Sequence, residues 1–106
     1  MQTRITARHF DAPDPLRAHI EQSVGRLTQY FDGIHGAHVV LDGALDGEPR
    51  KHAEVVLNLN RQTLTAREEA PTHQAAVDAC LRRLRRQVTQ HKDRLRDHKG
   101  RGTPRP

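Results

Sequence analysis

The hydrophobic positions at the start of the chain change from a period of two to a helical period. Alternation in QTRITARHF, residues 2–10, predicts a half-buried strand. After a turn with Pro13, Asp14 stands where the N-cap of a helix with Pro15 at its first position is expected. A helix is therefore predicted over residues 15–31. Its apolar stripe consists of Leu16, Ile20, Val24, Leu27 and Phe31.

Three segments in the middle of the chain are typical of strands. HVVL, residues 38–41, is a short apolar run, and KHAEVVLNLN, residues 51–60, alternates cleanly. In TLTAREE, residues 63–69, Leu64 and Ala66 continue the buried face. Gly- and Pro-rich residues join the first pair and a short polar turn joins the second, which predicts a meander.

A second, longer helix follows Thr72, which can cap it. The stripe expected to face the sheet is Val77, Cys80, Leu81, Leu84, Val88, His91 and Leu95. The element order is β-α-β-β-β-α. It predicts a single α+β domain over residues 1–98, with a four-stranded mixed or antiparallel sheet and two helices packed on one face. Residues 99–106 are expected to form a basic, disordered tail.

The size and composition of the chain are typical of a small, single-domain protein. A chain of 106 residues fits one domain, and with 34% hydrophobic residues and no Trp its core must be thin. Cys80 is the single cysteine and cannot form an internal disulfide. No stretch approaches the roughly 18 apolar residues of a membrane span, and no secretory signal is visible. We expect a soluble, cytoplasmic, monomeric protein without a membrane partner.

Charge is distributed unevenly along the chain. The net charge is +5, but residues 82–106 hold ten basic and two acidic residues, whereas the preceding part is mildly acidic. A local cationic segment is typical of proteins that bind a polyanion. Nucleic acid is favoured over anionic lipid, because the only apolar stripe of the basic helix is the one a core would need.

The basic helix could instead be a solvated face that serves solubility. Such faces usually interleave Glu with Lys, whereas Arg82 and Arg86 form a like-charged pair that repels by about 0.2–0.5 kcal/mol. The planar fork of Arg also binds phosphate in a bidentate manner. Phosphate contact is therefore the preferred interpretation.

Metal and catalytic chemistry have little support. The nearest histidine groupings are His35 with His38 and His91 with His98, without the cysteine ligands that zinc sites in small domains normally use. No nucleophile elbow, phosphate loop or paired carboxylates can be identified. We expect no cofactor, no metal, no small-molecule substrate and no enzymatic activity.

The chain also resembles the ribosome hibernation factors, a family formerly described as sigma-54 modulation proteins. The resemblance extends over nearly the whole chain to His98. The matching segments are ITARHF, LRAHIEQSVGRLTQYFD, HVVL, KHAEVVLNL and AVDACLRRLRRQVTQHKDRLRDH. Because the chain ends soon after this domain, it resembles the short class of the family.

The resemblance implies a protein that binds the 30S ribosomal subunit between head and body, over the messenger and transfer-RNA sites. It implies inhibition of translation in stationary phase or stress, without chemistry. In the family, basic residues of both helices contact 16S rRNA. The corresponding candidates here are Arg17, Arg26, Lys51, Arg82, Arg83, Arg86, Lys92, Arg94, Arg96 and Lys99. The family often has acidic residues at the positions of Arg82 and Arg85.

Two other functions remain open. The element order also resembles the double-stranded-RNA-binding domain, which would predict affinity for any RNA duplex. Alternatively, the basic helix could bind an acidic protein partner, such as a transcription factor. That partner would survive nuclease treatment.

Overall fold

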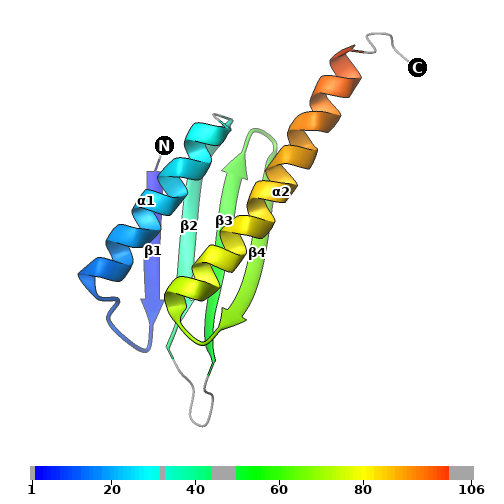
Figure 1. Cartoon of the computed structure of the whole chain (residues 1–106). Helices are drawn as coiled ribbons and strands as arrows, with labels where there is room; N and C mark the ends of the chain where they lie inside the picture. Colours follow the sequence, from blue (N-terminus) through cyan, green and yellow to red (C-terminus); the bar gives the residue numbers. More distant parts are fainter. Residues whose placement is uncertain (1, 32, 44–49, 101–106) are drawn as a thin grey trace.

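The computed structural model describes residues 2–31, 33–43 and 50–100, with only the helical backbone described for 91–100. The chain forms the predicted order of four strands and two helices, with both helices on one face of the sheet (Figure 1). The elements are β1 (Gln2–Arg8), α1 (Asp14–Tyr30), β2 (Ile34–Asp42), β3 (Lys51–Leu59), β4 (Gln62–Ala70) and α2 (His73–Gly100).

The sheet is mixed, with the strands in sequence order. β1 runs parallel to β2, and β2, β3 and β4 form the predicted antiparallel meander. The parallel pair arises because α1 carries the chain back to the end of the sheet where β1 began. β2 begins earlier than the predicted run at 38–41, because Ile34 already pairs with Leu59 of β3 and the residues from Gly36 onward pair with strands on both sides.

The N-termini of the two helices are capped in different ways. α1 begins at Asp14, so the prediction of Asp14 as N-cap was wrong by one residue. Pro13 takes the cap position in an extended conformation, without a side-chain cap. The carboxylate of Asp14 instead lies in the first turn, where the helix dipole favours negative charge. Thr72 caps α2 as predicted, since its Oγ1 accepts a hydrogen bond from Ala75 N at 3.1 Å.

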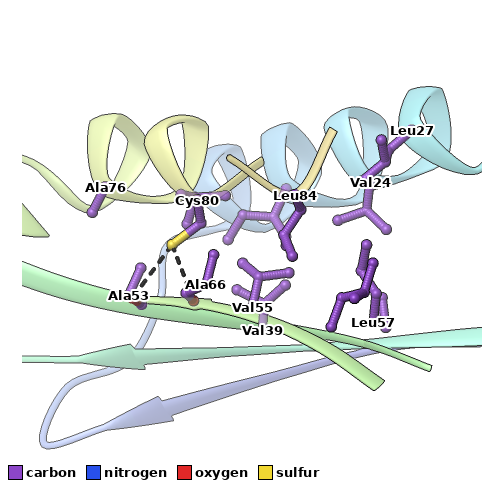
Figure 2. Packing of buried hydrophobic residues seen from close by; sticks show 14 of the residues in the cluster. Val24, Leu27, Val39, Ala53, Val55, Leu57, Ala66, Ala76, Cys80 and Leu84 are labelled. Atoms are coloured by element: carbon purple, nitrogen blue, oxygen red, sulfur yellow. Dashed lines mark hydrogen bonds between the residues drawn. The ribbon is translucent and has the colours of Figure 1, made fainter. Parts of the chain in front are cut away.

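The core is one layer between the sheet and the two helices (Figure 2). Ile20 and Val24 of α1 and Leu84 of α2 are fully buried, in agreement with the predicted stripes. They pack on alternate residues of the central strands, such as Val39 and Val55. The side chains of His91 and Leu95 lie outside the described residues. No polar or charged residue is buried among the residues that the structure describes.

Cys80 is buried within this core. Its sulfur lies 3.4 Å from Ala53 O and 3.5 Å from Ala66 O, so the single S–H is shared between these two acceptors (Figure 2). Burial raises the pKa of the Cys80 thiol to about 11, and the negative charge of Glu68 contributes to the shift. The thiol is therefore protonated at neutral pH and acts as a small core group.

Candidate nucleic-acid interface

α1 and α2 lie side by side on the sheet and run parallel to each other (Figure 1). Two polar bridges connect them at the same sequence separation of 59 residues. His19 Nε2 lies 2.8 Å from Asp78 Oδ1, and Tyr30 Oη lies 2.8 Å from Thr89 Oγ1. The helices are therefore joined near the start of each and again at the end of α1.

A groove with a volume of about 450 Å³ opens between the two helices. Its apolar lining comes from Leu27 and Leu81. Three arginines line it as well, Arg26 from α1 and Arg82 and Arg85 from α2. His19, Ser23 and Asp78 complete its polar lining. The groove thus combines an apolar surface with guanidinium groups from both helices and with the bridge between His19 and Asp78.

Tyr30 closes one end of this groove with a fixed orientation. Thr89 Oγ1 donates its proton to Arg85 O at 2.9 Å, so the Tyr30 hydroxyl must donate to Thr89. The guanidinium carbon of Arg85 lies 4.9 Å from the centre of the Tyr30 ring, a cation–π contact. Tyr30 is nevertheless 39% exposed. Arg85 is exposed as well, so both groups can be reached from solvent beside the groove.

Four arginines form the cationic surface around this groove, and we call them the arginine patch: Arg26, Arg82, Arg85 and Arg86. Arg86 lies with Arg82 and Arg85 around a shallower hollow on α2. None of the four forms an ion pair with a described side chain. Unneutralised guanidinium groups at this density favour a polyanionic ligand.

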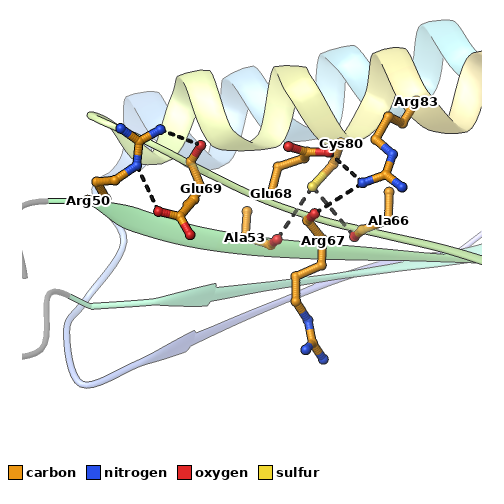
Figure 3. A network of polar contacts seen from close by, with 8 residues as sticks. All are labelled: Arg50, Ala53, Ala66, Arg67, Glu68, Glu69, Cys80 and Arg83. Carbon is orange, nitrogen blue, oxygen red and sulfur yellow. Dashed lines mark hydrogen bonds and ion pairs between the residues drawn. The ribbon is translucent and has the colours of Figure 1, made fainter.

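Arg83 differs from its neighbours on α2, because it faces β4. Its Nη1 lies 2.6 Å from Glu68 Oε2 and 3.5 Å from Arg67 O (Figure 3). Arg50 makes a similar contact, with Nε 2.8 Å from Glu69 Oε1. These guanidinium groups are already engaged by carboxylates and lie along the β4 edge of the sheet.

The other predicted contact residues either do not line the groove or have side chains outside the described residues. Arg17 Nε donates to Ala12 O at 3.2 Å and so braces the loop before α1. Lys51 begins β3 and does not line the groove. Lys92, Arg94, Arg96 and Lys99 belong to α2, but their side chains lie outside the described residues. α2 continues to Gly100, two residues past the expected domain boundary, and residues 101–106 lie outside the described part of the chain.

Sequence reasoning did not select Arg85 or Tyr30. Arg85 lies three residues after Arg82, a spacing that places both on one helical face, and this signal was available. Tyr30 lies beside the partly buried Phe31, and nothing in the local pattern shows that Tyr30 meets Thr89.

Comparison with known proteins supports the fold and decides the family. Residues 3–96 match the model of the family described as sigma 54 modulation protein / S30EA ribosomal protein. This chain belongs to that family. The S30EA assignment confirms the resemblance seen in the sequence.

Several S30EA relatives are named for ribosome hibernation. The chain is 33% identical to the ribosome hibernation promoting factor of Escherichia coli K12 over 92% of this chain and 100% of that protein. It is 30% identical to the ribosome hibernation promotion factor of Deinococcus radiodurans, over 97% of this chain but 55% of that protein.

Solved structures of similar proteins have the same fold. The N-terminal domain of Thermus thermophilus Protein Y superimposes with a TM-score of 0.74 at 30% identity, covering 86% of this chain and 99% of that domain. A ribosomal subunit interface protein from Coxiella burnetii gives a TM-score of 0.79 at 22% identity, with 88% and 99% covered.

The described residues also bear on metal binding and on membrane insertion. They contain no group of three or more His, Cys, Asp and Glu side chains that could hold a metal ion. None of the helices in the described part is long and apolar enough to cross a membrane.

Proposed function

We propose that this protein binds the 30S ribosomal subunit through the arginine patch and inhibits translation by occlusion. The single observation that carries the proposal is a cluster of guanidinium groups on two parallel helices, unpaired among the described residues, in a chain of the S30EA family. The Escherichia coli relative, matched over its full length, is named a ribosome hibernation promoting factor.

The charge pattern supports 16S rRNA as the ligand. The carboxylates of Glu54, Glu68 and Glu69 pair with Arg67, Arg83 and Arg50, whereas the four arginines of the arginine patch have no ion pair with a described side chain. Further candidate contacts are Arg17, Lys51 and Arg83 at the margins and Lys92, Arg94, Arg96 and Lys99 along α2. Phosphate contacts from these residues would release counterions, so binding should weaken steeply with salt.

Inhibition in this proposal is steric. A protein lodged between head and body of the small subunit, over the messenger and transfer-RNA sites, excludes both ligands without a chemical step. It would act as a monomer in the cytoplasm, in stationary phase or under stress, when idle ribosomes are conserved.

The test is sedimentation of the purified protein with 30S subunits, 50S subunits and a generic RNA duplex, each at two salt concentrations. We expect selective co-sedimentation with 30S that decreases with salt and is competed by transfer RNA. Equal binding to the duplex would contradict the proposal and indicate a general double-stranded-RNA-binding domain. Capture of an acidic protein that survives nuclease, without 30S binding, would indicate a protein-interaction role.

A further inference from the structure

The groove between α1 and α2 has a mixed chemistry that a row of duplex phosphates would not use. Leu27, Leu81 and the Tyr30 ring supply apolar and aromatic surface, while Arg26 and Arg82 supply guanidinium groups. A phosphate alone would leave the aromatic end empty, and an apolar ligand would leave the charges unmatched. A nucleotide carries both kinds of group.

The aromatic end of the groove is organised before any ligand arrives. The Tyr30 hydroxyl is held by Thr89 at 2.8 Å, and the Arg85 guanidinium lies over the ring at 4.9 Å. Proteins that bind single-stranded RNA stack unpaired bases on aromatic rings and on guanidinium planes. A surface that is already fixed loses little conformational entropy when a base binds.

The charged part of the groove is kept available by the bridge between His19 and Asp78. Asp78 lies four residues before Arg82, the spacing at which an acidic and a basic residue pair along a helix. Asp78 Oδ1 instead lies 2.8 Å from His19 Nε2, and Arg82 forms no ion pair with a described side chain. Arg82 can therefore bind a phosphate from the same groove that Arg26 lines.

We infer that the groove binds one unstacked nucleotide of a single-stranded RNA segment. The base stacks against the pair formed by Arg85 and Tyr30, and the adjoining phosphate lies between Arg26 and Arg82. This inference rests on the proposed rRNA-binding function and specifies the form of RNA that the helical face selects. A base inside a duplex is already stacked and paired, so it cannot enter the groove.

The first experiment uses NMR of the full chain, in which Tyr30 is the only tyrosine. Titration with hexa-adenylate RNA should shift the Tyr30 ring signals and the Arg85 Nε–H signal in a saturable manner. A 16-base-pair RNA duplex at the same nucleotide concentration should leave both signals in place. Unchanged signals with hexa-adenylate, or equal shifts with the duplex, would overturn the inference. A saturable shift with adenosine monophosphate alone, equal to that with hexa-adenylate, would overturn the assignment to an RNA strand.

The second experiment measures binding of labelled hexa-adenylate to variants by fluorescence anisotropy. Tyr30→Leu and Arg85→Gln should each weaken binding about 5- to 150-fold, the range measured for loss of one stacked base. Arg67→Gln, which removes a guanidinium on the opposite face of the sheet, is the matched control and should bind as the unmodified protein does. Thermal melts establish that each variant is folded. Tyr30→Phe keeps the ring and loses only the hydroxyl, so it should weaken binding less than Tyr30→Leu does.

The two proposals fail in different ways. If 30S subunits bind Tyr30→Leu and Arg85→Gln as tightly as the unmodified protein, the nucleotide groove is wrong and the ribosome-binding function stands. If hexa-adenylate shifts the Tyr30 signals but 30S subunits do not bind, the groove stands and the ribosomal assignment fails.

Discussion

The arginine patch should control the salt dependence of ribosome binding. The informative variant replaces Arg82, Arg85 and Arg86 together with Gln, which removes charge and keeps much of each side chain. All three lie around the groove or the adjoining hollow on α2 and have no ion pair with a described side chain. Their replacement should leave the core untouched, since none of them is buried.

The size of the effect follows from how many phosphates the three arginines neutralise. Arg85 stacks against a base in the inferred groove, so the triple variant loses two phosphate contacts, those of Arg82 and Arg86. Each neutralised phosphate contributes about 0.7 to 0.9 to the slope of log affinity against log salt, so the triple variant should have a slope shallower by about 1.4 to 1.8. Between about 50 mM and about 200 mM salt, the affinity of the unmodified protein should therefore fall about 7- to 12-fold more than that of the variant. Equilibrium binding to 30S subunits across a salt series measures both slopes.

A matched control separates local contacts from net charge. Arg4, Arg50 and Arg67, which lie outside the arginine patch and are not candidate contacts, can also be replaced together with Gln, which lowers the net charge equally. Arg4 is exposed on β1, and the guanidinium groups of Arg50 and Arg67 lie 2.8 and 3.2 Å from the carboxylates of Glu69 and Glu54. Figure 3 shows the pair formed by Arg50 and Glu69. The control should keep most of the original slope, at a cost in stability of about 0–1 kcal/mol for each exposed pair. An equal decrease of slope in both variants would refute the argument that the arginine patch is the contact surface.

The remaining predictions concern the fold and the cysteine. Leu84 is fully buried between helix and sheet, so Leu84→Ala should leave a cavity and lower the free energy of unfolding by about 2–5 kcal/mol, measured by urea titration. A smaller decrease would mean that the surrounding core collapses into that cavity. Thr72→Ala should cost about 0.5–2 kcal/mol by removing the cap of α2, whereas Thr72→Asn should restore much of it. The Cys80 thiol should resist a thiol reagent in the folded protein and react on unfolding, and rapid reaction in native buffer would contradict its burial. Folding raises the pKa of the Cys80 thiol from 9.0 to about 11, so the thiol of the unfolded state loses its proton at lower pH than that of the folded state. The free energy of unfolding should therefore fall as the pH rises from about 9 to about 11, and Cys80→Ala should lack that decrease.

The order and type of the elements could be predicted from the sequence because they depend on local periodicity. Alternation at Ala53, Val55 and Leu57 requires one buried face of a strand, and these residues are buried. The stripe on α2 likewise identified Val77, Leu84 and Val88 as core. The position of Asp14 was wrong by one residue because Pro13 satisfies the geometry of the cap position equally well.

The candidate site could be predicted only in outline. The concentration of Arg and Lys from residue 82 onward predicts an interface on the second helix, and the family match agrees with the resemblance seen in the sequence. Whether every residue in that set contacts rRNA stays a prediction. Adjacent positions on α2 nevertheless differ, since Arg82 lines the groove and Arg83 pairs with Glu68.

By itself, the sequence determined which segments become strands and helices, which faces are buried and where the positive charge accumulates. These properties depend on residues a few positions apart, within the reach of one helical turn or one pleat. The tertiary structure alone decided that β1 runs parallel to β2, that Asp78 pairs with His19 and not with Arg82, and that Tyr30 meets α2. Each of these contacts joins residues more than thirty positions apart, and the packing of two helices on one sheet, which no local pattern encodes, brings them together.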